Sequence, residues 1–368
     1  MPDVILKDIS YSNTIQNINL HIKNGEYLTI CGPTGAGKST ILKIIAGLIK
    51  PDKGRIYFDG VDITNKDPED RGIGMVFEHS TYALFPHMNV EKNVGYSPRV
   101  KEGKTLKESR QIIKYMLELV LLQDRPDAYP RELSGGMKQR VALARALMAS
   151  STTNLILLDE PLSALDAKIR LALRFELMNL VRRLGITCIH VTQDTEEALM
   201  VSDRIAIINK GRIIQVGTPR EIYETPKNLF VCRFISSSNF LVGEIEEINQ
   251  SGSVVRLEDG NKILVSDKTY DIGTKVVVAI RSENIKIKKG IDKEIQNGLA
   301  GKIETSKFVS GNSIEEIRLN SGNLFISKKP TTKYWFDPGE IVTIYFNPDR
   351  TLVFPFPKEG LEQALDIV

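Results

Sequence analysis

The sequence predicts an α/β fold followed by an all-β region, and three patterns carry this prediction. Up to about residue 235, short apolar runs alternate with segments of helical periodicity. After about residue 240, apolar residues alternate at period two and are interrupted by Asp-Gly, Asn-Gly and Pro-Gly turns. A glycine-rich loop directly follows one of the apolar runs. We therefore expect an α/β domain over residues 1–235 and an all-β domain over residues 236–368.

In the first domain, continuous apolar runs of this length are typical of a parallel sheet covered on both faces by helices. The runs that we expect to form its strands are 27–33, 154–159, 186–192 and 204–209. Apolar residues at helical spacing predict helices over 105–122 and 167–183. Thr218 and Glu221 form a capping-box pattern around Pro219, which predicts a further helix start.

Composition limits the class of protein. The chain has 368 residues, 42% of them hydrophobic and 26% charged, which is ordinary for a globular protein. The net charge of +3 is too small to indicate nucleic acid, and no apolar run is long enough for a membrane span. The start of the chain does not resemble a signal peptide. The three cysteines are far apart and lack metal-ligand spacing, and because Cys31 and Cys188 lie in apolar runs we interpret these two as buried thiols in a reducing compartment.

The second domain reads as one or two small β barrels. Barrels of this kind can bind nucleic acid, but residues 240–368 hold 17 Lys and Arg against 19 Asp and Glu. A net charge of −2 opposes a phosphate-backbone partner. The aromatic run 334–336 is then expected to be core rather than a base-stacking platform.

The loop "GPTGAGKST" lies between a predicted strand and a predicted helix, and it matches the pattern G-x-x-x-x-G-K-[ST]. Its glycines allow backbone N–H groups to surround phosphate oxygens, and the following helix adds its positive end. Lys38 would contact the terminal phosphates, and Ser39 would offer a hydroxyl to Mg²⁺. The predicted nucleotide-binding set is Gly32, Pro33, Thr34, Gly35, Ala36, Gly37, Lys38, Ser39 and Thr40.

Two acids end the run "NLILLDEP", at the sheet edge where open α/β sheets bind ligands. Asp159 suits a place near Mg²⁺, and Glu160 suits a general base for an attacking water. Many buried strands end in acids, so these two residues indicate a nucleotide site only in combination with the phosphate loop.

The segment "ELSGGMKQRVALARAL" (132–147) resembles the signature of the ATPases of ABC transporters, with Met137 in the place that usually holds glutamine. The order of motifs agrees, including "SALD" (163–166), and the resemblance covers roughly residues 3–235. It implies a P-loop NTPase with a RecA-like core and a helical subdomain over about 88–150. It also implies a dimer that holds two ATP molecules, in which Ser134, Gly135, Gly136 and Met137 contact the nucleotide of the other subunit.

Further details are similar to importers of the sugar, polyamine and oxyanion type. The segment 81–94 resembles the part that faces the membrane permease, and the β region resembles an OB-like TOBE domain. The resemblance implies a peripheral location on the cytoplasmic side of the membrane. A single cassette with a β region also indicates that the second ATPase subunit is another copy of this chain. It implies transmembrane permease subunits as partners, an extracytoplasmic binding protein as an indirect one, and no nucleic acid. The paired β repeats favour a carbohydrate-type substrate.

The sequence departs from this family after the predicted strand 186–192. The usual pattern is V-T-H-D, whereas here Gln193 follows Thr192. The resemblance implies that this position senses the γ-phosphate and orients the attacking water, so Gln193 is the candidate catalytic residue there. Gln193 keeps an N–H donor but cannot titrate near neutral pH. His190 is not expected to replace the missing histidine, because its position in the strand directs it to the other face.

A second departure lies at the Q-loop, where Glu78 stands in place of glutamine and two extra residues precede Tyr82. Glu78 keeps an oxygen for Mg²⁺ but adds a negative charge near the γ-phosphate. At ~6 Å and an effective dielectric of ~20, such a repulsion costs on the order of 3 kcal/mol before the metal screens it.

Tyr11 is the candidate for the aromatic residue that stacks on adenine, and the alternative is a surface turn. The resemblance as a whole predicts an ATP-hydrolysing subunit that uses ATP and Mg²⁺ to power an importer. A regulator that binds nucleotide without hydrolysis is the alternative that Glu78 and Gln193 raise. A soluble ABC ATPase of DNA repair or translation is disfavoured by the β region and by the segment 81–94.

Overall fold

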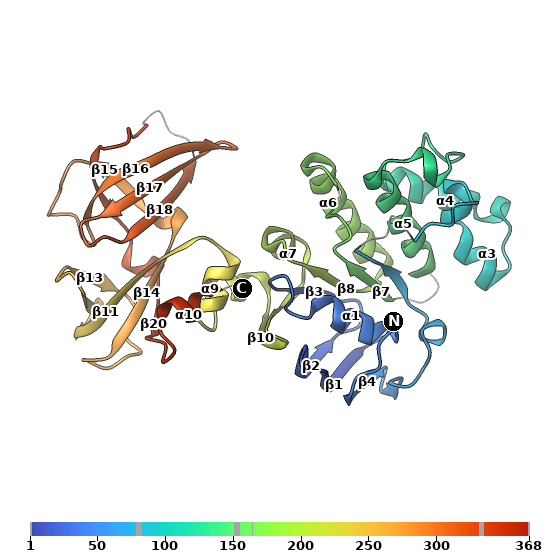
Figure 1. Cartoon of the computed structure of the whole chain (residues 1–368), viewed down its shortest axis with the longest axis horizontal. Helices are drawn as coiled ribbons and strands as arrows, with labels where there is room; N and C mark the ends of the chain where they lie inside the picture. Colours follow the sequence, from blue (N-terminus) through green and yellow to red (C-terminus); the bar gives the residue numbers. More distant parts are fainter. Residues whose placement is uncertain (1, 79–82, 151–154, 164, 331–334, 367–368) are drawn as a thin grey trace. The chain divides into compact units, whose positions relative to one another are not determined.

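The computed structural model describes residues 2–78, 83–150, 155–163, 165–330 and 335–366 (Figure 1). The chain divides into two compact units, one that ends at Ile222 and one that begins at Tyr223. Among the described residues no helix is long and apolar enough to cross a membrane.

The first unit contains a six-stranded sheet of order β10-β9-β3-β8-β7-β6. Its strands are β3 (Tyr27–Cys31), β6 (Gly74–Val76), β7 (Leu155–Asp159), β8 (Thr187–Thr192), β9 (Arg204–Asn209) and β10 (Arg212–Gly217). All neighbours are parallel except β10 and β9. Every residue of β3, β7 and β8 is buried, so the predicted parallel sheet with both faces covered is confirmed.

An antiparallel sheet of order β2-β1-β4-β5 lies in the same unit, and the sequence patterns did not predict it. Its strands are β1 (Val4–Tyr11), β2 (Ile15–Ile22), β4 (Lys53–Phe58) and β5 (Val61–Asp62). The pairing of β1 with β2 shifts register between Leu6 and Ile9 and again before Tyr11. These bulges interrupt the period-two alternation that identifies a strand.

Helices pack on both faces of the parallel sheet. They are α1 (Lys38–Ala46), α2 (Val90–Val94), α3 (Tyr96–Glu102), α4 (Leu106–Leu119), α5 (Gly135–Ser150), α6 (Ala167–Leu184), α7 (Thr195–Val201) and α8 (Pro219–Glu224). Along β7, Leu155 and Leu157 join a core with α1 and the antiparallel sheet, whereas Ile156 and Leu158 join a core with α4, α5 and α6. One face of the parallel sheet therefore carries a helix together with a second sheet rather than helices alone.

The predicted helix starts have the expected local chemistry. Thr105 and Glu108 form a capping box at α4, within the predicted range 105–122. The side chain of Asp166 caps α6, and Thr218 with Glu221 caps α8 through reciprocal hydrogen bonds. These caps satisfy backbone donors that have no partner inside the helix.

The second unit holds two five-stranded antiparallel sheets of order β13-β12-β11-β14-β20 and β15-β19-β16-β17-β18. The first comprises β11 (Ser238–Asn249), β12 (Gly252–Leu257), β13 (Lys262–Val265), β14 (Lys275–Arg281) and β20 (Thr351–Pro355). The second comprises β15 (Lys286–Lys289), β16 (Leu299–Val309), β17 (Asn312–Leu319), β18 (Leu324–Pro330) and β19 (Ile341–Tyr345). Both sheets contribute to one apolar core, as the all-β prediction requires.

Two short helices, α9 (Leu229–Ile235) and α10 (Leu361–Leu365), pack together on β14 and β20. The contacts of α9 thus place residues 223–235 with the β unit, whereas the change of sequence pattern lies near residue 235. In the predicted aromatic core, Phe336 is 5% exposed but Trp335 is 46% exposed, and Tyr334 lies outside the described residues.

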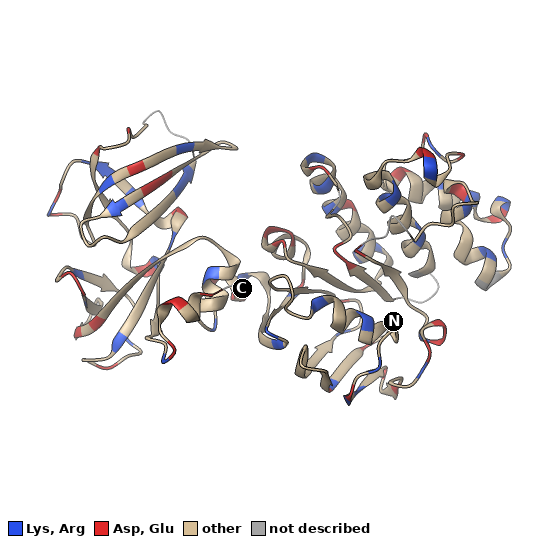
Figure 2. Ribbon diagram, viewed as in Figure 1, with Lys and Arg blue, Asp and Glu red and all other residues tan. Residues whose placement is uncertain are grey.

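Acidic and basic residues are interspersed over the second unit (Figure 2). Several pair across neighbouring strands, for example Lys307 with Glu316 at 3.1 Å and Arg318 with Glu304 at 2.8 Å. The surface of this unit therefore carries mixed charge.

Candidate active site

The phosphate loop connects β3 to α1 at the carboxyl end of the parallel sheet. A side chain at Gly32 is excluded, because a Cβ there would lie 2.3 Å from the carbonyl oxygen of Ile208. Gly37 has φ 98°, which favours glycine, and it is the residue that precedes α1. Its open backbone lets the chain turn sharply, so that the first N–H groups of α1 face the loop.

Lys38 is fixed at the centre of this loop. Its ammonium donates to the carbonyl oxygens of Gly32 and Pro33 at 2.9 and 2.8 Å. An ammonium has three donors, so one remains for a phosphate oxygen. Burial lowers the pKa of Lys38, and the carboxylate of Glu160 opposes that shift.

Ser39 and Asp159, two of the predicted Mg²⁺ ligands, contact each other. The Ser39 hydroxyl donates to Asp159 Oδ1 at 2.8 Å, and Asp159 is 2% exposed. Glu78 follows β6, and its charge raises the pKa of both Lys38 and Asp159, so it lies within electrostatic range of this pair. A hydroxyl and carboxylate oxygens are the donors that Mg²⁺ prefers, and these residues therefore fit that ion.

Glu160 begins the turn after β7 in a left-handed conformation, with φ 46°. Its backbone N–H donates to the carbonyl of Val191 at 3.0 Å, and its own carbonyl accepts from Ser163 Oγ at 3.0 Å. The signature helix α5 adds a donor to the same carbonyl through Gln139 Nε2 at 3.3 Å. Backbone strain of this kind persists where surrounding bonds over-determine it.

The carboxylate of Glu160 accepts the backbone N–H of Gln193 at 3.0 Å. Burial raises the pKa of Glu160 to about 7, against the opposing effect of Lys38. A carboxylate with this proton affinity is suited to accept a proton near neutral pH.

Gln193 is attached to the phosphate loop, a contact that sequence reasoning missed. Its Oε1 accepts the hydroxyl proton of Thr34 at 2.9 Å. Among the described residues no hydrogen bond occupies its Nε2, which leaves amide protons for a ligand. Gln193 thus lies between the loop and Glu160, where a γ-phosphate sensor is expected.

His190 is 1% exposed, and its Nδ1 lies 3.2 Å from the hydroxyl of Tyr27. Burial lowers its pKa, so the ring is neutral at physiological pH. It is enclosed on the same face of the sheet as Tyr27 of β3 and, as expected, does not take the place of Gln193.

Tyr11 ends β1, and the turn that follows it packs on the phosphate loop. A Cβ at Gly37 would lie 2.5 Å from Ile15 Cδ1 and 3.1 Å from the carbonyl oxygen of Thr14. The half-buried Tyr11 is therefore carried by a turn that borders the nucleotide site.

The signature residues open α5. Ser134 Oγ accepts the N–H of Met137 at 3.3 Å, which caps the helix, while Ser134 and Gly135 are exposed. Within the described residues no hydrogen bond joins Ser134–Met137 to the phosphate loop of the same chain. Their exposed helix end is accessible to a ligand from outside the chain.

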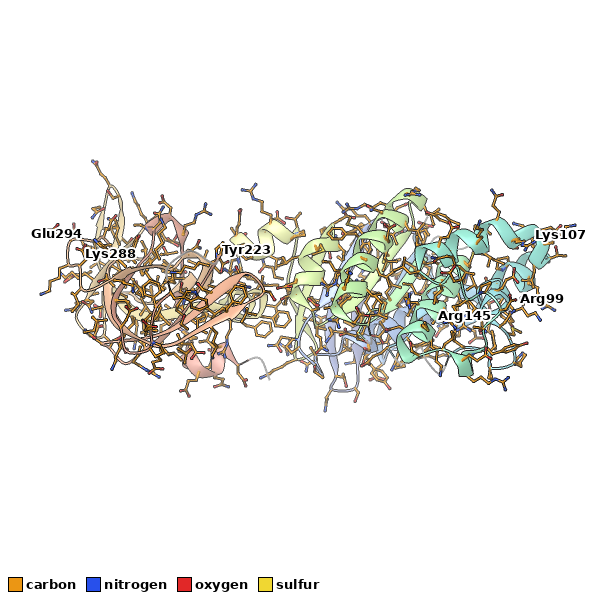
Figure 3. The ribbon with its side chains drawn as sticks, turned by 90° about the horizontal axis from the view of Figure 1, so that it is seen from above. Arg99, Lys107, Arg145, Tyr223, Lys288 and Glu294 are labelled. Atoms are coloured by element: carbon orange, nitrogen blue, oxygen red, sulfur yellow. The ribbon has the colours of Figure 1, made fainter. Side chains whose placement is uncertain are left out.

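A partly apolar cavity lies beside the helical subdomain and is lined by residues of β6, α3 and α5, with Phe85. Phe85 packs on Tyr96 with ring centroids 4.5 Å apart, and the Arg145 guanidinium lies 5.2 Å above the Phe85 ring. Arg145 and Arg99 are labelled at this end of the first unit in Figure 3. Residues 79–82 of the predicted Q-loop and permease-facing segment lie outside the described residues, as does Ala164 of the "SALD" motif.

Comparison with known proteins identifies the families that this chain resembles. Residues 15–163 match the family model for ABC transporters, and residues 278–354 match that for the TOBE domain. The spermidine/putrescine import ATP-binding protein PotA of Thermobifida fusca is 38% identical over 94% of this chain and 89% of that protein. PotA of Thermotoga maritima is also 38% identical, over 92% and 93%. The Fe(3+) ions import ATP-binding protein FbpC of Fusobacterium nucleatum is 40% identical over 84% and 80%.

A solved structure, the post-hydrolysis dimer of the ATP-binding cassette MJ0796 bound to ADP and Pi, shares 32% identity and a TM-score of 0.54. That similarity covers 59% of this chain and 99% of the cassette, so it concerns the nucleotide-binding part.

Proposed function

Because the chain belongs to the ATP-binding proteins of ABC importers with a TOBE domain, and is an ATPase, we propose a specific division of labour among its residues. Residues 32–40 and Lys38 bind the phosphates of ATP, and Tyr11 stacks on adenine. The contact of the Tyr11–Ile15 turn with Gly37 supports the role of Tyr11, since it brings the turn to the loop.

Glu160 acts as the general base. It accepts a proton from the attacking water while the water oxygen forms a bond to the γ-phosphorus and the bond to ADP breaks. The observation that carries this proposal is the bridge Thr34–Gln193–Glu160, which joins base, sensor and phosphate loop through hydrogen bonds of 2.9 and 3.0 Å. Gln193 donates its amide protons to the γ-phosphate, a role that needs no titration.

Ser39 and Asp159 would hold Mg²⁺, with Glu78 as the third oxygen donor. When bound, the ion neutralises phosphate charge and orients the terminal phosphates. The negative charge of Glu78 is attracted by cationic Lys38 and repelled by Asp159, and a bound cation would offset that repulsion.

The exposed N-terminal end of α5, which carries the signature residues, suits contact with a nucleotide held by another subunit. We infer that Ser134, Gly135, Gly136 and Met137 complete the site of a second ATPase subunit, and that the partner is a second copy of this chain. The exposed end of α5, unattached to its own phosphate loop in the described residues, supports this arrangement.

The cavity around Phe85 and Arg145 suits a permease segment that presents an apolar side chain and a hydrogen-bond acceptor or anion. This partner places the chain on the cytoplasmic side of the membrane as a peripheral subunit, with the extracytoplasmic binding protein acting through the permease.

For the transported substrate, we propose a polyamine-type cation, because PotA relatives are similar over more than nine-tenths of this chain. The carbohydrate-type expectation rested on the β repeats alone and stays a prediction. ATPase stimulation in permease-containing vesicles tests both, with binding protein loaded with spermidine, with maltose or with ferric ion.

The decisive experiment on hydrolysis compares the full chain and Glu160→Gln, each assembled with its permease. We expect the variant to lose at least about 100-fold in ATP turnover while it still binds ATP. Equal, background-level turnover of both would favour the regulator that binds nucleotide without hydrolysing it.

A further inference from the structure

A buried polar cluster lies behind the catalytic base, at the corner where β8 leads into α7. It consists of Thr192, Glu197 and Arg174, whose exposed fractions are 0%, 4% and 6%. Thr192 stands in the V-T-x-D pattern beside Gln193, whereas Glu197 and Arg174 lie outside the nucleotide motifs, and Arg174 is carried by α6. Buried charges are costly, so their pairing here requires an explanation.

Thr192 connects this cluster to the base. Its hydroxyl lies 2.9 Å from Glu197 Oε2 and 3.5 Å from Glu160 Oε2, and it accepts the N–H of Asp194 at 3.0 Å. The two carboxylate oxygens of Glu160 are thus approached by consecutive residues, Gln193 through its N–H and Thr192 through its hydroxyl. The orientation of the base depends on the position of this corner.

Glu197 is itself fixed from several sides. Its backbone N–H donates to Asp194 Oδ1 at 2.9 Å, and its Oε1 lies 3.5 Å from Arg174 Nε. Arg174 also pairs with the carboxylate of Asp194. On the remaining side, His190 Nε2 lies 4.0 Å from Glu197 Oε2. One guanidinium from α6 therefore pairs with Asp194, the N-cap of α7, and with Glu197 in its first turn, and Glu197 in turn holds Thr192.

We propose that Glu197, held by Arg174, is a positioning residue for hydrolysis that acts through Thr192 on the orientation of Glu160 and Gln193. It touches neither nucleotide nor water. Because the backbone N–H of Gln193 belongs to the same corner, a shift of this corner moves the base and the phosphate sensor together. This inference rests on the proposed role of Glu160 as the base.

A purely structural role would make the same cluster a clamp of α7 with no bearing on the reaction. Ser202, just after α7, supplies a matched control. Its hydroxyl is buried and bonds Thr29 Oγ1 at 2.5 Å and the carbonyl of Ala198 at 2.7 Å, away from Glu160. Ser202→Ala thus removes a buried polar contact at the other end of the helix.

The test measures kcat, KM for ATP and the unfolding midpoint for the full chain assembled with its permease. Thr192→Val and Glu197→Leu remove the link, Thr192→Ser retains the hydroxyl, and Ser202→Ala is the control. We expect the first two to lower kcat by about ten- to a hundred-fold with KM changed less than about threefold, because a small misplacement of a catalytic group is costly. Thr192→Ser should restore most of kcat, and Ser202→Ala should lower the midpoint without lowering kcat.

Unchanged kcat in Thr192→Val would overturn the inference, and so would an equal loss of kcat in Ser202→Ala. If Glu197→Leu does not fold, the comparison of Thr192→Val with Thr192→Ser decides alone. Glu160→Gln distinguishes a failure of the positioning role from a failure of the proposed base. Loss of turnover there together with an intact Thr192→Val refutes only the positioning role, whereas full turnover in Glu160→Gln refutes the proposed base itself.

Discussion

Both units bury cations, and they use them in opposite ways. In the first unit, Lys38 is 7% exposed and its two hydrogen bonds within the described residues go to loop carbonyls, which leaves one ammonium proton for a ligand. In the second unit, Arg281 is 3% exposed, and its Nη atoms donate to Cys232 O, Ser236 Oγ and Tyr223 O at 2.6, 2.6 and 2.8 Å. A buried cation that keeps a terminal donor beside a phosphate loop indicates a binding site, whereas one whose terminal Nη groups are used by the chain holds the fold together.

The largest effect should come from Arg281→Met. The substitution leaves carbonyl and hydroxyl acceptors without donors, so we expect a loss of about 3 kcal/mol in the free energy of unfolding of the β unit. The single tryptophan, Trp335, lies in this unit and reports its unfolding by fluorescence. Nucleotide binding at equilibrium should remain, since the phosphate loop lies in the other unit.

The matched control is Arg318→Met, because Arg318 pairs with Glu304 on the surface and is 46% exposed. Exposed pairs contribute about 1 kcal/mol or less. Equal destabilisation by the two substitutions would remove the distinction between a structural and an ordinary surface arginine.

Tyr11→Ala tests nucleotide binding by the first unit. Stacking of an aromatic ring on a base contributes about 1–3 kcal/mol, so KM for ATP should rise about tenfold, whereas Tyr11→Phe should leave it nearly unchanged. Steady-state kinetics at fixed Mg²⁺ measure both. An unaltered KM in Tyr11→Ala would assign Tyr11 to a surface turn.

Gln193→His sharpens the role of the phosphate sensor. Glutamine does not titrate, whereas histidine has an ordinary pKa near 6.5. The ratio of variant to wild-type turnover should therefore be highest where the imidazolium can donate, and it should fall as pH rises through about 6–7. A pH-independent ratio would mean that residue 193 does not contact the reacting phosphate.

His190 should give the smallest effect. Burial lowers its pKa in the folded chain below the unfolded value of about 6.5. The unfolded chain therefore binds more protons, so stability is lost as pH falls below about 6.5, at no more than about 1.4 kcal/mol per pH unit. His190→Phe should flatten this slope in urea titrations between pH 7 and 5. His87→Gln, which removes an exposed histidine, is the control, and an equal change in slope there would contradict the assignment.

Much of the site could be predicted because its motifs are local. The loop 32–40, the acids after β7 and the signature each depend on consecutive residues whose spacing fixes their geometry. The antiparallel sheet was not predicted because bulges near Ile9 interrupt its alternation. The link from Thr34 to Gln193 joins residues far apart in the chain, so no local pattern announces it.

Glu78 and Gln193 illustrate what the sequence alone left open. The sequence alone raised the question of whether a donor at 193 compensates for an added charge at 78. The structure supplies part of the answer, since Gln193 is bound to the phosphate loop while the charge of Glu78 acts on Lys38 and Asp159. The two departures thus act on different members of the site.

The sequence by itself determined four strands of the parallel sheet, the phosphate loop, the acids at the sheet edge and the all-β character of the second unit, because periodicity and short motifs act over a few residues. Only the tertiary structure decided that α9 packs with the β unit, that both Nη atoms of Arg281 are bonded by the chain, and that Arg174 reaches the corner behind Glu160. These contacts bring together residues distant in sequence. They form because buried polar groups must find partners, and that requirement is met only when the whole chain has folded.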